Sequence, residues 1–366
     1  KNNKPAKIGS YISNFELKNS LKILSKDKYS LKKGLLAKKI ATSMIGYIPL
    51  GDINQWETKA IEPLCKKYYK YKICGFPPPT SGGISVLQIL GILKNRLDLR
   101  KNNEPFFQQH AFLEASRLSY LDRDFYIADP NYFEVPVKSL LDESYLKQRA
   151  SLIKNKSSQN YKRGLIDQFI ESNLIKGVNH ENQSTTHISI VDSMGNAVSL
   201  TSSIEFAFGS GITIGGFFMN NQLTDFSFYS KDLEGAQIAN SVSPGKKPRS
   251  SMAPTFIFDD KQNLVGIIGS PGGSRIICYV AKTIFDILYL KIAPDRAIEN
   301  IHLCSRNKFS EIEDTKKNRD LINYLKQKGH SIMVKKMTSG INMIWRREDY
   351  WQGVADPRRE GHAIGN

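Results

Sequence analysis

The sequence predicts an α+β protein with a mainly helical front half and a back half rich in strands. In the front half, apolar residues recur at helical spacing in ELKNSLKIL, LKKGLLAKKIATSMI and FFQQHAFLEASRLSYLDRDFYI. After Ser184 the pattern changes, because THISIVD alternates, SMGN is a turn signal and AVSLTSSIEFAF is β-prone. A polar stretch, residues 154–184, separates the halves, and we interpret it as a linker or an exposed segment.

The remaining elements follow in chain order. GFPPPTSGGISVLQILGILKN predicts a Pro/Gly loop that leads into a buried helix. TFIFDD and NLVGIIGS flank Lys261-Gln262 and predict a second hairpin. SRIICYVAKTIFDILYL predicts an apolar helix, and INMIWRREDYWQGVAD returns to strands.

Length and composition limit the number of domains and the class of protein. The chain has 366 residues, 40% of them hydrophobic, enough for one large or two ordinary domains. No apolar run approaches the roughly 18 residues of a membrane span, so we expect no transmembrane helix. The sequence begins at Lys1 with no apolar signal-peptide core, and we expect it to start inside a longer precursor.

The net charge of +17 is concentrated in the front half. The part from Thr185 onward has 22 Lys and Arg against 18 Asp and Glu, whereas the part before it has 30 against 17. Such a surplus fits a lysine-rich solvated surface or an anionic polymeric partner. No nucleic-acid-binding motif accompanies it.

The four cysteines, Cys65, Cys74, Cys278 and Cys304, show no metal-binding spacing. Cys278 lies in an apolar helical run, and we expect it in the core. Cys65 and Cys74 flank a short basic segment and can form a disulfide in an oxidising compartment.

The first hairpin raises the question of chemistry. If its turn centres near Met194, Thr185 lies opposite Ser203. A threonine hydroxyl is a weak nucleophile unless a base is adjacent, and a threonine made N-terminal by cleavage carries that base as its own α-amine. On the local pattern, Thr185 is either an ordinary strand-opening residue or such a nucleophile.

Six motifs decide between these readings. TTHISIVDSMGNAVSLTSS, FFMNNQLTDFS, PGKKPRSSMAPT and GSPGGSR resemble, in order and spacing, the small subunit of γ-glutamyltranspeptidases. VADPRREGHAIG resembles the C-terminal signature of that family, and GFPPPTSGGISVLQIL resembles its large subunit. The family belongs to the N-terminal-nucleophile hydrolases, and the resemblance covers essentially the whole chain.

The resemblance implies a four-layer αββα sandwich, and autocatalytic cleavage between Ser184 and Thr185. Residues 1–184 then form the C-terminal part of a large subunit, and residues 185–366 form the small catalytic subunit of a heterodimer. The implied activity is transfer of a γ-glutamyl group from glutathione or a related donor to an amino acid, a peptide or water. It implies no cofactor and no metal, and a periplasmic or secreted location.

The resemblance also assigns the catalytic residues. Thr185 matches the nucleophile, and Ser203 falls where the family usually has a threonine that hydrogen-bonds it. Gly272 and Gly273 match the oxyanion-stabilising pair, where one lost donor typically costs about 2.7–4 kcal/mol. GSPGGSR by itself could suggest phosphate binding at a helix start, but it lacks the ending of a nucleotide P-loop.

The donor-binding residues follow in the same way. Glu205, Gln222 and Asp225 match the group that holds the donor α-amine, since an ammonium has donors and no acceptor. Ser250 and Ser251 match the serine pair for the α-carboxylate. Without the family, these residues fit turn and capping roles, and Ser203 fits an exposed strand position.

Two departures qualify the resemblance. The family's large subunit begins roughly two hundred residues earlier, so the sequence is a fragment, is completed by other residues, or is a truncated product. The arginine that pairs with the donor carboxylate lies in that absent part, and Arg117 and Arg123 lie in a different segment.

Residues 226–249 correspond to a variable segment that forms a lid in some members.

Three rival functions stay open. A poly-γ-glutamate depolymerase and a cephalosporin-type acylase are relatives with a shifted acyl preference. Gln222, Asp225 and the serine pair favour a γ-glutamyl donor. The third is an inactive truncated homologue that binds an anionic partner through its lysine-rich front half.

Overall fold

The structure is a computed structural model, and it describes residues 6–96, 104–169, 174, 176, 184–231, 235–306 and 308–365. The chain separates into two units, Lys1–Ala60 with Phe208–Asn221, and Ile61–Ala207 with Gln222–Asn366. The predicted 154–184 segment falls partly outside the described residues. Its described part holds a short 3₁₀ helix, Asp167–Phe169.

The smaller unit consists of α1 (Phe15–Lys26), α2 (Leu35–Ser43), α3 (Leu50–Gln55), β5 (Thr213–Ile214) and β6 (Phe217–Phe218). Asn14 begins α1, because its side chain accepts the Leu17 amide at 2.9 Å. The same side chain donates to the Gly216 carbonyl at 2.7 Å, and so ties α1 to the small hairpin.

The larger unit is built on a six-stranded antiparallel sheet. Its spatial order is β1 (Leu64–Tyr68), β2 (Tyr71–Gly75), β7 (Thr255–Phe258), β8 (Leu264–Gly269), β12 (Asn342–Arg346) and β13 (Trp351–Ala355). The second predicted hairpin is thus confirmed as β7–β8, and the C-terminal strands as β12–β13. Because β2 pairs with β7, segments far apart in the sequence share one sheet.

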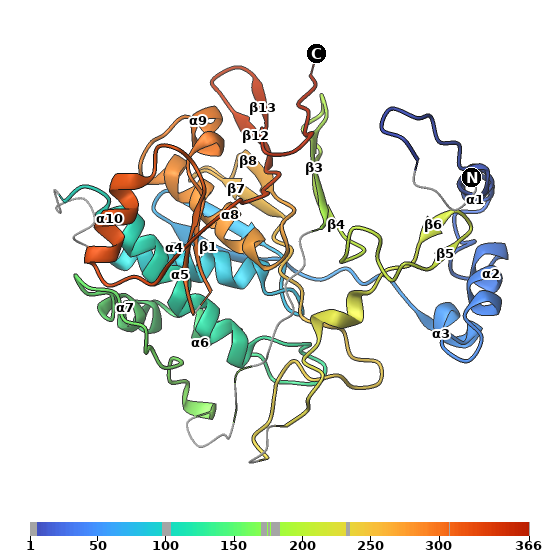
Figure 1. Ribbon diagram of the computed structural model, residues 1–366, viewed down its shortest axis with the longest axis horizontal. Helices are drawn as coiled ribbons and strands as arrows, with labels where there is room; N and C mark the ends of the chain where they lie inside the picture. Colours follow the sequence, from blue (N-terminus) through green and yellow to red (C-terminus); the bar gives the residue numbers. More distant parts are fainter. Residues whose placement is uncertain are drawn as a thin grey trace. The chain divides into compact units, whose positions relative to one another are not determined.

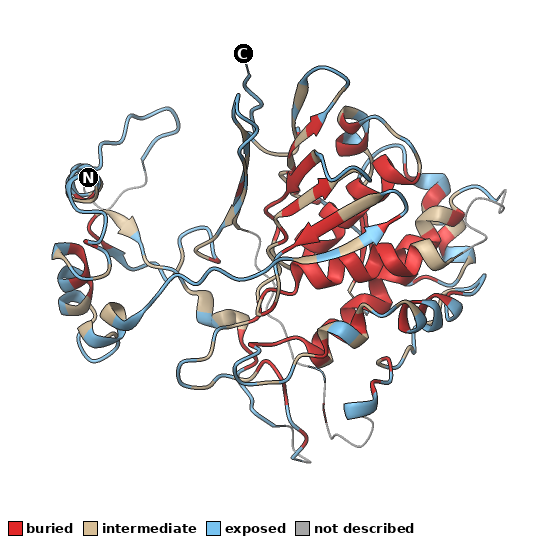
Figure 2. Ribbon diagram, turned by 180° about the vertical axis from the view of Figure 1, so that it is seen from behind, coloured by how far each residue is buried: buried red, intermediate tan, exposed pale blue. Residues whose placement is uncertain are grey.

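Buried helices cover one face of this sheet (Figures 1 and 2). α4 (Gly82–Asn95) and α8 (Ile276–Leu288) contact strands of the sheet, and α5 (Phe107–Tyr126) packs on α4. All three helices were predicted from apolar spacing. α4 contacts β1, β2, α5 and α8, and its residues from Gly82 to Leu93 are all buried. The main hydrophobic core lies between these helices and the sheet.

Smaller elements surround this core. The short helices in the described part of this unit include α6 (Val137–Leu140), α7 (Glu143–Ser151), α9 (Pro294–Glu299) and α10 (Arg319–Gln327). A three-stranded sheet contains β9 (Leu303–Ser305), β10 (Ser310–Glu313) and β11 (Ile332–Lys335), with β10 in the middle. None of the helices in the described part of the chain is long and apolar enough to cross a membrane.

The hairpin of β3 (Thr186–Val191) and β4 (Ala197–Ser202) lies against β8 and β12. Met343 of β12 belongs to the core shared with the helices, whereas the side chain of its neighbour Asn342 accepts the Ser189 amide at 3.3 Å. Successive strand residues point to opposite faces, so the hairpin lies on the face away from the helices. Helices, sheet and hairpin therefore give three layers of the expected sandwich in the described part of this unit, and the α+β class is confirmed.

Both disulfides contribute to this unit. Cys65 and Cys74 face each other across β1 and β2 and are bonded, as the sequence allowed. Cys278 is fully buried as expected, but it is also bonded to Cys304, which links α8 to β9. Sequence spacing gave no signal for this second pair.

Candidate active site

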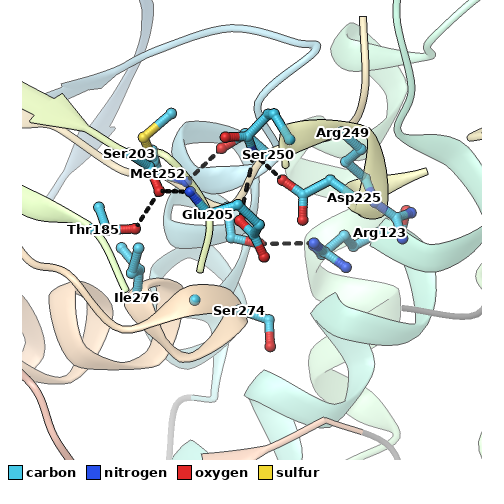
Figure 3. A pocket seen from close by; sticks show the side chains of 13 residues that line it. Arg123, Thr185, Ser203, Glu205, Asp225, Arg249, Ser250, Met252, Ser274 and Ile276 are labelled. Atoms are coloured by element: carbon cyan, nitrogen blue, oxygen red, sulfur yellow. Dashed lines mark hydrogen bonds between the residues drawn. The ribbon is translucent and has the colours of Figure 1, made fainter. Parts of the chain in front are cut away.

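The hairpin register brings Thr185 to Ser203. Thr186 pairs with Ser202, so the predicted register is confirmed. Asp192 fixes the turn by accepting the Met194 and Asn196 amides at 2.9 and 2.8 Å. One step beyond the strands, the Thr185 hydroxyl donates to Ser203 Oγ at 3.0 Å, as Figure 3 shows. Ser203 Oγ also accepts the Glu205 amide at 3.0 Å, which fixes its position.

The backbone around Thr185 is unusual. Its φ of 100° lies in a region that a β-branched residue rarely adopts, and such conformations cost of order 1–3 kcal/mol. The carbonyl before it, that of Ser184, accepts the Gly272 amide at 3.3 Å. Its own carbonyl accepts from Arg359 Nη1 at 3.5 Å. The two peptide units on either side of Thr185 are therefore each held at their carbonyl, and Thr185 between them has a strained conformation.

The glycine pair forms a turn that a side chain would disrupt. Gly272 and Gly273 have φ values of +138° and +60°. A Cβ on Gly272 would lie 2.6 Å from Tyr279 Cε2, so no larger residue fits without movement. The turn continues through a 3₁₀ helix, Gly273–Arg275, into α8. The amides at this helix start suit a developing negative charge.

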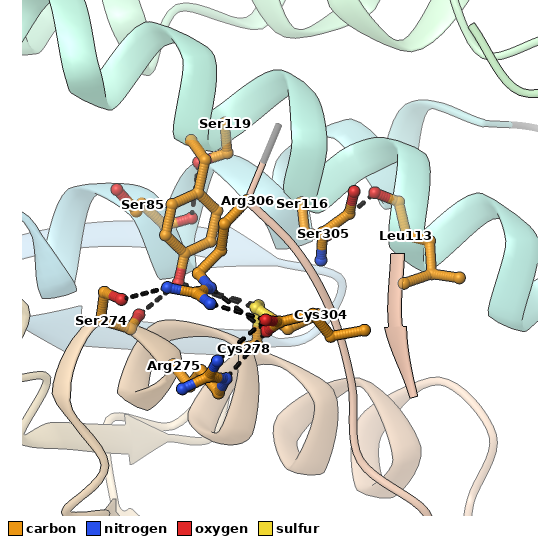
Figure 4. Close-up of a disulfide and its surroundings, with 12 residues drawn as sticks. Ser85, Leu113, Ser116, Ser119, Ser274, Arg275, Cys278, Cys304, Ser305 and Arg306 are labelled. Carbon is orange, nitrogen blue, oxygen red and sulfur yellow. Dashed lines mark hydrogen bonds and ion pairs between the residues drawn. A yellow bond between two sulfur atoms is a disulfide. The ribbon is translucent and has the colours of Figure 1, made fainter. Parts of the chain in front are cut away.

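Buried contacts anchor this turn (Figure 4). Tyr120 donates its hydroxyl hydrogen to the Ser274 carbonyl, and Arg306 donates to Ser274 Oγ at 2.8 Å. Arg275 and Arg306 both pair with Glu311. Burial favours the protonated carboxyl, but these two arginines lower the pKa of Glu311 to about 2. Together with the Cys278–Cys304 bond, these contacts fix the start of α8.

Glu205, Gln222 and Asp225 meet at one part of the pocket. Gln222 Nε2 donates to Glu205 Oε2 at 3.4 Å and also to Asp225 Oδ2. Burial raises the pKa of Asp225, although the hydrogen bond from Gln222 and the charges of Arg123 and Arg249 oppose that shift. Two carboxyls beside an amide oxygen form a suitable site for an ammonium group.

Ser250 and Ser251 line another part of the same pocket. The Ser250 carbonyl accepts both the amide and the hydroxyl of Ser81, at 2.8 and 2.7 Å. Ser81 belongs to the PPPTSGG segment, whose Gly82 packs so closely that a Cβ would lie 2.1 Å from the Met252 carbonyl. The Pro/Gly loop therefore positions the serine pair.

One pocket brings most of the predicted residues together. It is lined by Thr185, Ser203, Glu205, Gln222, Asp225, Ser250, Ser251 and Gly273. Gly272 is not among the lining residues and contacts the Ser184 carbonyl instead. In the residues that the structure describes, no group of His, Cys, Asp and Glu could hold a metal ion.

The sequence missed five lining residues: Arg123, Arg249, Met252, Ser274 and Ile276. Arg123 lies on α5 and donates from Nη2 to Ser251 Oγ at 2.8 Å, although its segment differs from the one that holds the family's carboxylate-binding arginine. Arg249 is buried, and burial together with the charge of Arg123 lowers its pKa to about 9. The available signal was a run of charged residues inside the apolar pattern of α5.

Known proteins resemble this chain over its whole length. The family model described as Gamma-glutamyltranspeptidase matches residues 1–366. A glutathione hydrolase proenzyme of Bacillus subtilis is 32% identical over 391 aligned positions, covering 100% of this chain and 63% of the relative. A glutathione hydrolase proenzyme of Escherichia coli is 34% identical over 78% of this chain and 49% of its own length. The chain thus spans about half to two thirds of these relatives.

A solved structure gives the same result for the fold. The crystal structure of a cephalosporin acylase from Bacillus halodurans superimposes with a TM-score of 0.81 at 22% identity. It covers 97% of this chain and 64% of the acylase chain. The fold is that of the N-terminal-nucleophile hydrolases. Within that class, the match over the whole chain shows that the protein belongs to the γ-glutamyltranspeptidase family.

Proposed function

We propose that the protein cleaves the γ-glutamyl amide bond of glutathione or a related donor and transfers the γ-glutamyl group to an amino acid, a peptide or water. Thr185 is the nucleophile of this reaction. The observation that carries the proposal is the Thr185–Ser203 hydrogen bond in a pocket that also holds Glu205, Gln222, Asp225 and the serine pair.

The chain first has to cleave itself. The Thr185 hydroxyl attacks the Ser184 carbonyl carbon, the Ser184–Thr185 C–N bond breaks, and an ester and the free α-amine of Thr185 result. Water then hydrolyses the ester and leaves a carboxylate on Ser184. The strained φ of Thr185 and the Gly272 amide on the Ser184 carbonyl support this step.

The mature site then uses the new terminus as a base. An α-amine has an unperturbed pKa of about 7.7–8.0, so a useful fraction is neutral near pH 7.5. It accepts the hydroxyl proton as Thr185 attacks the donor carbonyl, and returns a proton to the leaving amine. The acyl-enzyme then passes the γ-glutamyl group to the acceptor. Gly272 and Gly273 stabilise the oxyanion.

Related activities form the second candidate. The chain is 30% identical to a capsule biosynthesis protein CapD proenzyme of Bacillus anthracis and 27% identical to an acylase ACY 1 proenzyme of a Pseudomonas. An ammonium site beside a serine pair suits an amino acid headgroup, and therefore favours a γ-glutamyl donor over an acylase substrate. The basic front half keeps poly-γ-glutamate as a candidate donor.

The two disulfides support a periplasmic or secreted location, because disulfides persist in oxidising compartments. Within such a compartment, we propose that the working form is a heterodimer of residues 1–184 and 185–366.

The test is processing together with release of a chromogenic amine from a γ-glutamyl anilide. Purified protein should split into two pieces, the second with Thr185 as its first residue, and should then release the amine. The Thr185→Ala variant should stay whole and inactive. A wild-type chain that stays intact and releases no amine would refute the enzyme proposal, and would favour the inactive homologue.

A further inference from the structure

We propose that Arg123 is the positioning residue that makes the serine pair select a carboxylate on the donor, and that it acts through the Ser251 hydroxyl. The inference rests on the proposed function, because it names the residue behind donor recognition in the same pocket.

Arg123 is 2% exposed, and its guanidinium ties three segments together. Nη2 donates to Ser251 Oγ at 2.8 Å, Nε donates to Ser81 Oγ at 2.8 Å, and Nη1 donates to Asp124 Oδ1 at 2.9 Å. A serine hydroxyl that accepts from a guanidinium keeps its own proton for donation. Arg123 therefore orients Ser251 as a donor.

The same guanidinium fixes the other serine indirectly. Ser81, which accepts from Arg123, holds the Ser250 carbonyl through both its amide and its hydroxyl. One buried cation thus positions both members of the pair. The planar guanidinium of an arginine suits this positioning role better than the ammonium group of a lysine, because its N–H groups point in fixed directions.

The charges around Arg123 add to this preference. Arg249 is buried next to it and donates to the Arg123 carbonyl at 2.8 Å. Asp124 pairs with both arginines, but it is also paired with Lys176 at 3.5 Å. Asp225, with Glu205 and Gln222, lies at the ammonium part of the pocket (Figure 3). Arginines beside the serine pair, and carboxyls in the same pocket, suit a group with one carboxylate and one ammonium.

A purely structural role for Arg123 makes a different prediction, and Arg117 is the matched control. Arg117 lies on the same helix, is 1% exposed, and donates to Ser310 Oγ at 3.0 Å. It is absent from the lining of the pocket. If burial and hydrogen bonding were all that mattered, substitutions of the two arginines would have similar effects on ligand preference.

The experiment measures ligand preference by calorimetry on the purified protein, whether or not the chain has cleaved itself. The ligands are L-glutamate and its α-carboxamide, isoglutamine, which differ only in the group that faces the serine pair. The wild type should prefer glutamate. Arg123→Gln should reduce that preference about tenfold or more, Arg123→Lys should restore part of it, and Arg117→Gln should leave it unchanged. An unchanged preference in Arg123→Gln, or equal losses in both glutamine variants, overturns the inference.

A second pair of variants applies if Arg123→Gln does not fold. Ser251 accepts from Arg123, whereas Ser250 Oγ accepts the Met252 amide at 3.2 Å. The inference therefore predicts a larger loss of preference in Ser251→Ala than in Ser250→Ala. Equal losses, or a larger loss in Ser250→Ala, count against it.

The two proposals fail separately, because glutamate binding requires no bond cleavage. A protein that binds glutamate through Arg123 but releases no amine from a γ-glutamyl anilide contradicts only the proposed function. A protein that releases the amine but keeps its preference without Arg123 contradicts only this inference. A wild type without preference for glutamate also overturns the inference.

Discussion

The amide of Gly272 donates to the carbonyl oxygen of Ser184 at 3.3 Å. The two residues are distant in sequence, since Ser184 lies just before β3 and Gly272 lies between β8 and α8. Negative charge would develop on this oxygen when Thr185 attacks the preceding carbonyl. In the proposed mechanism, the N–H that assists self-cleavage is also one of the pair assigned to substrate turnover, so both reactions should respond together to changes at this turn.

Substitution of Gly272 tests this link. Gly272→Ala adds a Cβ that would lie 2.6 Å from Tyr279 at a φ of +138°, so the turn must shift. Loss of one oxyanion donor typically lowers rates about 10²–10³-fold, and we expect such losses in both processing and amine release. Gly195→Ala is the control, since Gly195 also has positive φ but its Cβ would meet nothing within 4 Å. Normal processing in Gly272→Ala would contradict the assignment.

The Ser203 hydroxyl should matter for the orientation of Thr185. Ser203→Ala removes the acceptor of both the Thr185 hydroxyl and the Glu205 amide. Two neutral hydrogen bonds at about 0.5–1.5 kcal/mol each predict cleavage and turnover about ten- to a hundredfold slower. Ser203→Thr keeps the hydroxyl and should stay within a few fold of the wild type. The measurements are the rate of chain cleavage and kcat, and equal behaviour of the two variants would count against this role.

Donor binding should weaken in acid because of Asp225. Burial raises the pKa of this carboxyl, so protonation begins at a higher pH than for an exposed aspartate. Only the ionised form attracts the donor ammonium, and affinity for L-glutamate should therefore fall as pH falls through that raised pKa. The Asp225→Asn variant should bind L-glutamate more weakly at neutral pH, and its affinity should no longer fall as the pH passes through the pKa of Asp225. Calorimetric Kd values across pH check the expectation, and parallel profiles for both proteins would refute it.

Stability should also fall in acid, through His187. Burial lowers the pKa of this imidazole to about 4, from 6.5 in the unfolded chain. The unfolded state therefore binds the proton first, and the stabilising contribution is complete above about pH 6.5 and is lost as pH falls toward 4. A difference of this size corresponds to about 3 kcal/mol. Thermal unfolding of His187→Gln should depend less on pH in this window than that of the wild type.

The buried disulfide should contribute more stability than the cross-strand one. Cys278 and Cys304 are 26 residues apart, whereas Cys65 and Cys74 are 9 apart. In the chain-entropy description, a disulfide stabilises the fold more when it closes a longer loop in the unfolded chain. The free energy is roughly 3 kcal/mol for loops of about 15 residues. Replacing both cysteines by alanine should therefore lower Tm more in the 278/304 pair than in the 65/74 pair. Amine release should fall as well in the former, because that bond helps fix the start of α8.

Local features of the site were predictable from the sequence. The alternation in β3 and β4 and the turn at Asp192 fix the register, and with it the approach of Thr185 to Ser203. The Gly272-Gly273 pair was recognisable from its resemblance to a family motif, and the structure shows that a Cβ at Gly272 would meet Tyr279. These features depend on residues close in sequence, or on a motif that a family shares.

Features that depend on packing between distant segments were not predictable. Arg123 reaches the serine pair only because α5 packs beside the 249–252 segment. The Cys278–Cys304 disulfide could not be predicted from the sequence. The apolar run around Cys278 predicted that this residue is buried, but it did not indicate a bonding partner. In both cases the contact arose from the tertiary fold, and the sequence indicated burial only for Cys278.

The placement of the disulfides has a consequence for the nicked protein. Cys65–Cys74 lies wholly before Thr185, and Cys278–Cys304 lies wholly after it, so neither bond joins the two pieces that cleavage would produce. Non-covalent contacts instead hold the two pieces together. β2 of the first piece is hydrogen-bonded to β7 of the second piece within one sheet, and α4 of the first piece packs on α8 of the second. Detergent should therefore separate the two polypeptides without any reducing agent, whereas under native conditions they should copurify and unfold as one body.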